Sequence, residues 1–138
     1  MEVKDVVVDN PTSAALVDEG NWILLEETGL WKGWTKIVDK NSGNIVCLSS
    51  RSCGDEDRKT VLPSLKEFGS LKVVDLDGYR YISTLEEACI GDLAELQRLS
   101  LTRCSLLTSL PSSLGNLTNL TEVRGVQRVQ NQPWKHIS

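Results

Sequence analysis

Few residues in this sequence could carry out acid–base chemistry. The single histidine is His136, two residues before the end of the sequence, in a segment that we expect to be frayed. Neighbouring carboxylates occur as Glu86-Glu87 and as Asp55-Glu56-Asp57. Carboxylate pairs act as general acid and base only with a pocket and an oriented partner, and the sequence around them suggests neither. We therefore expect no enzymatic activity, and we interpret the acidic run before Arg58 and Lys59 as a solvated loop.

The four cysteines are the other residues with reactive or metal-binding side chains. They are Cys47, Cys53, Cys89 and Cys104. Their spacing contains no C-x-x-C pair, and with one histidine they do not match a zinc site. The glycines form neither a P-loop nor a dinucleotide fingerprint. We expect no metal and no cofactor, and we interpret the cysteines as reduced thiols, mostly packed as small apolar groups.

Composition limits the classes of partner. The chain has 138 residues, is 40% hydrophobic and 25% charged, and has a net charge of −4, as expected for one soluble domain. Its basic residues are scattered along the sequence, so nucleic acid and anionic membranes are poor candidate partners. The first residues lack the apolar run of a secretory signal, and no segment is long enough to span a membrane. We expect an intracellular, cytoplasmic protein.

Two sequons for N-glycosylation argue against that location. They are Asn116-Leu117-Thr118 and Asn119-Leu120-Thr121. Both lie inside a leucine-spaced stretch whose apolar spacing accounts for them without a glycan. We therefore give them little weight.

An apolar pattern returns about every 25 residues. Its three copies are Leu71, Val74 and Leu76, then Leu96, Leu99 and Leu101, then Leu120 and Val123. Matching spacers precede them: Leu65 and Phe68, then Ile90 and Leu93, then Leu114 and Leu117. Three apolar ladders in register across successive copies indicate a structural repeat.

Each copy contains a strand signal followed by a helical signal. Apolar and polar residues alternate over 73–76 and 98–101, which predicts strands with one buried face. In the stretch Leu110–Leu117 the apolar residues recur at steps of three and four, which predicts a short helical or 3₁₀ return. A single unit cannot bury its apolar face, so the copies must stack with their strands parallel.

Two stretches carry a resemblance to a known family. Leu96-Gln97-Arg98-Leu99-Ser100-Leu101, followed by Ser109-Leu110-Pro111-Ser112-Ser113-Leu114-Gly115-Asn116-Leu117-Thr118-Asn119-Leu120, resembles the leucine-rich-repeat family, in its plant and protist type. The resemblance covers roughly residues 14 to 124. It implies an α/β fold: a short solenoid of about four repeats with a parallel concave sheet and an N-terminal cap of a helix plus a hairpin.

The stretches 30–34 and 39–48 are similar to the cap and first repeat that precede such arrays. We expect a helix over 11–19 and a hairpin formed by 34–38 and 44–49 around Lys40-Asn41-Ser42-Gly43. Three tryptophans would cover the open end of the repeat core, although they could instead form a ligand cage: Trp22, Trp31 and Trp34. The expected organisation, all in one folded unit, is a cap at 1–43, repeats at 44–124 and a tail or partial cap at 125–138.

The sequence departs from the family pattern in two places. The positions of the asparagine that usually follows each strand in the family hold Arg51, Tyr79 and Cys104, of which the cysteine can donate weakly to a buried carbonyl. The tail after Val123 stops matching the repeat. Either it folds back over the last repeat through Val126, Val129 and Trp134, or the apolar end meets a partner, or the chain is a fragment.

Partner binding in such arrays usually resides on the concave sheet. Alternation assigns eleven residues to this face as solvent-exposed, forming an acidic centre beside a basic row: Ile45, Cys47, Ser49, Val73, Asp75, Asp77, Arg98, Ser100, Thr102, Glu122 and Arg124. The leading hypothesis is a non-catalytic scaffold that binds a protein through this face or through the open C-terminal end. The alternatives are a ligand-sensing repeat fragment of a larger plant-type immune receptor or receptor kinase, and a structural accessory subunit of a multiprotein complex.

Overall fold

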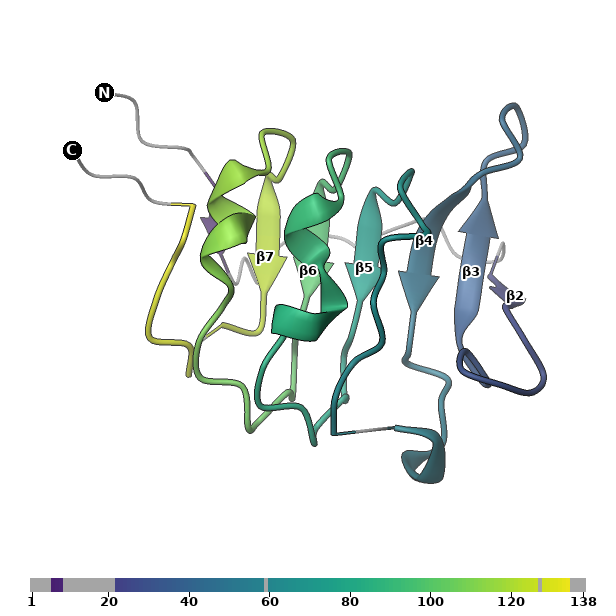
Figure 1. Ribbon diagram of the computed structural model, residues 1–138, viewed down its shortest axis with the longest axis horizontal. Coiled ribbons are helices and arrows are strands. Elements are labelled where there is room, and N and C mark those ends of the chain that lie inside the picture. Colours follow the sequence, from purple (N-terminus) through teal and green to yellow (C-terminus); the bar gives the residue numbers. More distant parts are fainter. Residues whose placement is uncertain (1–5, 9–21, 59, 127, 135–138) are drawn as a thin grey trace.

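The computed structural model describes residues 6–8, 22–58, 60–126 and 128–134. These residues form one seven-stranded sheet with the order β1-β7-β6-β5-β4-β3-β2 (Figure 1). The strands are β1 (Val7–Val8), β2 (Ile23–Leu24), β3 (Thr35–Val38), β4 (Ile45–Ser49), β5 (Val73–Asp75), β6 (Arg98–Ser100) and β7 (Glu122–Arg124). The strands predicted over 44–49, 73–76 and 98–101 are thus present, each shorter by one residue.

The four strands β4 to β7 are parallel neighbours in sequence order. Cys47 pairs with Val73, Val73 with Arg98, and Arg98 with Glu122, which are steps of 26, 25 and 24 residues. The ladder continues beyond the strands, because Leu76 N donates to Ser100 O and Leu101 N donates to Arg124 O, each at 2.8 Å. The carboxyl ends of all four strands therefore lie along one edge of the sheet.

The apolar core lies on one side of these four strands. Leu48, Val74, Leu99 and Val123 occupy matching positions and are each 0% exposed. Since side chains alternate along a strand, their neighbours in sequence point to the opposite face. Burying one leucine of this kind contributes about 2 kcal/mol, so the aligned rows of leucines are the main source of stability.

The 3₁₀ helices are η1 (Asp55–Asp57), η2 (Glu86–Ala88), η3 (Ile90–Asp92) and η4 (Ser112–Asn116), and η3 and η4 lie in contact (Figure 1). η1 buries no side chain and lies in the connection after β4, whereas the other three cover the core on the side opposite the strands. Each of the last three buries one apolar side chain, namely Ala88, Ile90 and Leu114. The protein is thus a mixed fold of sheet and helical turns, within the α/β class that we expected.

The hairpin predicted before the parallel strands is confirmed. β3 and β4 are antiparallel, and the turn between them is held by Asp39, whose carboxylate accepts hydrogen bonds from Asn41 N at 3.2 Å and Ser42 Oγ at 2.9 Å. Gly43 closes this turn with a φ of +76°. These hydrogen bonds lower the pKa of Asp39. The helix expected over 11–19 lies outside the described residues.

Two of the three tryptophans pack at the hairpin end of the core. Trp31 and Trp34 are 4% and 1% exposed, and their rings meet edge to face with centroids 5.0 Å apart. Trp31 also meets Phe68, and its Nε1 donates to Glu67 Oε1 at 3.1 Å. Trp22 is half-buried. Protein side chains surround both buried rings, and no space is left between the rings for a ligand. The two tryptophans therefore fit the role of covering the core better than that of a ligand cage.

The other end of the core is covered in the described part of the chain. Val126 and Trp134 are 6% and 0% exposed, and the amide of Asn131 brackets Leu110 with two hydrogen bonds of 2.8 and 2.9 Å. At the sheet edge, β1 pairs in parallel with β7, and Val7 N donates to Thr121 O at 2.9 Å. Of the three alternatives for the tail, this arrangement agrees with the one in which it folds back.

Candidate functional site

The eleven residues assigned to the partner-binding face lie on β4 to β7 and the turns that follow them, on the side away from the leucine core. We call this surface the polar face. The expectation that all eleven are exposed is wrong, because seven are buried: Cys47, Ser49, Val73, Asp75, Asp77, Ser100 and Glu122. Thr102 is exposed, and Ile45, Arg98 and Arg124 are half-buried. Alternation places a side chain on a face, but neighbouring strands and long side chains decide whether solvent reaches it.

The acidic centre of the polar face is a closed ionic network. Arg51 Nη2 lies 3.0 Å from Asp75 Oδ2 and 2.8 Å from Asp77 Oδ2. Asp77 Oδ1 also accepts hydrogen bonds from Ser100 Oγ and, at 3.0 Å, from Thr102 N. Asp75 and Asp77 are 4% and 8% exposed, whereas the Arg51 side chain is 61% exposed. A partner would therefore meet the arginine, while the carboxylates hold the strands together.

Burial raises the pKa of Asp75, and the neighbouring Asp77 carboxylate raises it further. The hydrogen bond from Asp77 N, the charge of Arg51 and the hydrogen bond from Ser49 oppose this shift. Desolvation is the largest of these effects because it penalises the charged form of the buried carboxyl group.

The basic row lies over a third buried carboxylate. Glu122 is 8% exposed and lies 2.6 Å from Arg124 Nε and 3.7 Å from Arg98 Nε. The Arg98 and Arg124 side chains are 39% and 22% exposed. The accessible charge of the polar face is thus positive, which corrects the expected pattern of an acidic centre beside a basic row.

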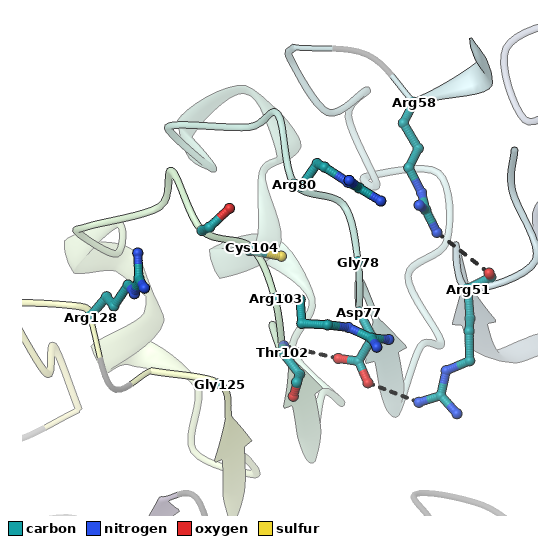
Figure 2. A pocket seen from close by; sticks show the side chains of 11 residues that line it. Arg51, Arg58, Asp77, Gly78, Arg80, Thr102, Arg103, Cys104, Gly125 and Arg128 are labelled. Atoms are coloured by element: carbon teal, nitrogen blue, oxygen red, sulfur yellow. Dashed lines mark hydrogen bonds and ion pairs between the residues drawn. The ribbon is translucent and has the colours of Figure 1, made fainter. Parts of the chain in front are cut away.

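A pocket of about 670 Å³ adjoins the polar face at the carboxyl ends of the parallel strands. Its lining comes from the turns after β4, β5, β6 and β7, and we call it the arginine pocket (Figure 2). Its charged side chains are Arg51, Arg58, Arg80, Arg103, Arg128 and Asp77. Figure 2 shows Arg128 set apart from the other arginines, at the opposite end of the pocket.

Sequence reasoning missed this pocket because the arginines are far apart in the chain. A signal was nevertheless present: Arg103 and Arg128 are 25 residues apart, the step that separates Val73 from Arg98. Applying the apolar period to charged residues would have placed both arginines on consecutive turns. The arginines are scattered in the sequence, but they lie on the turns that follow neighbouring parallel strands, and the register of the sheet places these turns side by side.

The cysteines have structural surroundings. Cys47, Cys53 and Cys104 are buried, and none of the four forms a disulfide. Burial raises the pKa of Cys47 and of Cys53 to about 11 and that of Cys104 to about 12. The predicted donation by Cys104 is confirmed, since its Sγ lies 3.2 Å from Leu76 O.

One residue of the aligned turn positions was assigned wrongly. Tyr79 N and Cys104 N donate to Leu76 O and Leu101 O, and the equivalent donor after β4 is Cys53 N, which donates to Ser50 O. Cys53 thus occupies the position that we gave to Arg51. The turn after β4 holds its arginine two residues earlier, where the side chain reaches Asp75 and Asp77.

The carboxylate pairs considered for catalysis lie at the surface. Glu86 and Glu87 are exposed in η2, and Asp55 pairs with Arg58 at 3.1 Å. Among residues 6–8, 22–58, 60–126 and 128–134, no three histidine, cysteine or acidic side chains group as metal ligands. His136 lies outside these residues. No helix in the same described ranges has the length and apolar character needed to cross a membrane.

Comparisons of the chain with protein-family models, curated proteins and solved structures gave no match.

Proposed function

We propose that this protein is a short leucine-rich-repeat module that binds an acidic region of another protein through its polar face and catalyses no reaction. Support comes from the apolar rows at steps of 24 to 26 residues, each placing one fully buried side chain per strand. The resemblance of residues 96–120 to leucine-rich repeats adds to this support.

The observation that carries the proposal is the charge that solvent can reach on the polar face. Arg51 and Arg98 keep 61% and 39% of their side chains exposed above buried carboxylates. An exposed guanidinium group presents positive charge and a planar face to a partner, whichever contacts it makes within the protein. Arginine is also among the residues most often found at the energetic centre of protein interfaces.

The polar face is a better candidate surface than the C-terminal end. Val126 and Trp134 are buried there and β1 occupies the edge of β7, so the described residues leave no bare apolar end. A partner that docked on that end would have to displace Trp134.

The test compares Arg98→Gln with Lys66→Gln. Arg98→Gln removes a charge from the polar face without placing a second carboxylate beside Glu122, which stays 2.6 Å from Arg124. Lys66 is a suitable control because its side chain is 67% exposed and it lies outside the polar face. In a parallel experiment, a photo-crosslinking amino acid would replace Arg98 in one variant and Lys66 in another.

We expect crosslinking to an acidic partner from position 98 and not from position 66. We also expect Arg98→Gln to weaken binding of that partner about tenfold, the usual effect of losing one charge-assisted hydrogen bond. Crosslinking from both positions, or unchanged affinity of Arg98→Gln, would show that binding does not run through the polar face.

A further inference from the structure

The arginine pocket concentrates positive charge in an acidic protein. The sequence has seven arginines and a net charge of −4, and five of those arginines line this one pocket, whose one carboxylate among the described residues is Asp77. None of the lysines among the described residues lines it. A concave site with several arginines focuses a positive potential that the chain as a whole does not have.

The basic groups of the pocket exceed the carboxylates that neutralise them. Asp77 is occupied by Arg51, and Asp55 is shared by Arg58 at 3.1 Å and Arg80 at 3.6 Å. No carboxylate of the described residues lies within ion-pair distance of Arg103 or Arg128, both of which are exposed. At least two positive charges in the pocket are therefore available to an anion.

Arg58 adds a second observation that points to a ligand. Its side chain is only 9% exposed, its Nη1 contacts Asp55, and its Nη2 donates to Ser50 O and Arg51 O. Its Nε, also buried, has no hydrogen-bond partner in the described part of the chain. A buried N–H without an acceptor is costly, and an anion in the pocket would supply acceptor oxygens beside it.

The use of arginine alone indicates the chemical class of that anion. The guanidinium group presents paired N–H donors that match two oxygens of a phosphate, and a lysine ammonium does not. Arg51 and Arg128 lie on turns three strands apart, about 14 Å at the usual spacing of about 4.8 Å between strands. An anion with several linked phosphate groups can contact more of these arginines at once than a single phosphate can.

We propose that the arginine pocket binds a small molecule that carries two or more linked phosphate groups. The volume of about 670 Å³ lies in the range of small-ligand pockets, of about 300 to 1,000 Å³. A nucleic acid is a poorer fit, because a long polyanion would also meet the negative charge of the rest of the chain. Arg51 belongs to both the arginine pocket and the polar face, but Arg103 and Arg128 line the pocket alone, so variants at these two positions test this proposal separately from the protein partner.

The test measures binding of inorganic tripolyphosphate by isothermal titration calorimetry to the full chain. The pocket variant is Arg103→Gln combined with Arg128→Gln, which removes two charges that no described carboxylate needs. The matched control is Lys40→Gln combined with Lys66→Gln, two exposed lysines outside the pocket and the polar face. Circular dichroism and urea unfolding establish that each variant folds.

We expect tripolyphosphate to bind the wild type and the lysine control equally, and sulfate to bind far more weakly. Each lost arginine should raise the Kd about tenfold, so the double pocket variant should bind about 100-fold more weakly. Binding should also weaken with added salt.

Three results would overturn the proposal: no binding of tripolyphosphate to the folded wild type, equal weakening by the lysine control, or binding of a short glutamate peptide as tight as that of tripolyphosphate. Loss of partner crosslinking at position 98 would leave it unaffected, because that position lies outside the pocket.

Discussion

Arg51 and Asp77, which are 26 residues apart in the sequence, form an ion pair of 2.8 Å between the turns that follow β4 and β5. The same carboxylate accepts hydrogen bonds from Ser100 Oγ and Thr102 N on the next strand and turn. Asp77 thus links three consecutive strand ends. The carboxylates of the polar face are therefore structural, and their removal should be measured as a loss of stability.

We expect Asp77→Ala to lower the free energy of unfolding by about 2 kcal/mol, because the buried Ser100 hydroxyl and the Thr102 amide lose their acceptor. Urea unfolding measures this change. Asp92→Ala is the control, since that side chain is 59% exposed and its nearest ammonium is 4.0 Å away. A loss no larger than the control's would show that the network does not hold the turns.

The raised pKa of Asp75 predicts an unusual pH dependence. A carboxyl group with a higher pKa in the folded chain binds its proton more tightly there, so its contribution favours folding at low pH. That contribution is lost as the pH rises from the ordinary value of 3.8 through the raised pKa. We expect the unfolding free energy of the wild type, relative to Asp75→Asn, to fall as the pH rises above the ordinary carboxyl pKa of 3.8. A difference that rises instead would mean that Arg51 outweighs burial and lowers this pKa.

Gly125 should tolerate alanine much less well than Gly43. Both have a φ near +80°, at +79° and +76°, so either substitution is strained by about 1 kcal/mol. A Cβ on Gly125 would also overlap the backbone of Leu101 and Thr102, whereas one on Gly43 would meet nothing within 4 Å. We expect Gly125→Ala to cost about 3 kcal/mol in total, measured by urea unfolding. Equal costs would indicate that the turn after β7 does not press against the turn after β6.

Trp134 should contribute to stability as a core residue. It is 0% exposed, so Trp134→Ala should lower the unfolding free energy by about 3 to 5 kcal/mol. Leu106→Ala is the control for an exposed apolar side chain, 54% exposed, and should change stability by less than about 0.5 kcal/mol. If Trp134→Ala behaves like the control, the C-terminal end of the core is open and becomes the better candidate for partner binding.

Much of the fold could be predicted from local patterns. The alternation around Val74 and Leu99 predicted the strands, and Asp39 with Gly43 forms the turn of the predicted hairpin. The resulting pairing depends on side-chain periodicity and turn chemistry, which are properties of neighbouring residues.

The candidate site was less predictable because it depends on contacts between distant residues. The burial of Asp75 and Asp77 follows from Arg51, which reaches them from another strand end. The pairing of β1 with β7 joins residues more than 100 positions apart, and no sequence spacing predicts it. The arginine pocket required the register of four strands before its members could be grouped.

The position of β1 also sets a constraint on the order of events while the chain is being made. β1 is the first of the seven strands to leave the ribosome, and β7, its only neighbour in the sheet, is the last. The backbone groups of Val7 and Val8 therefore have no partner strand until residues 121–123 have been synthesised. This edge of the sheet can therefore form only after β7 has been made, and until then the nascent chain presents an apolar strand that a chaperone or another chain could bind.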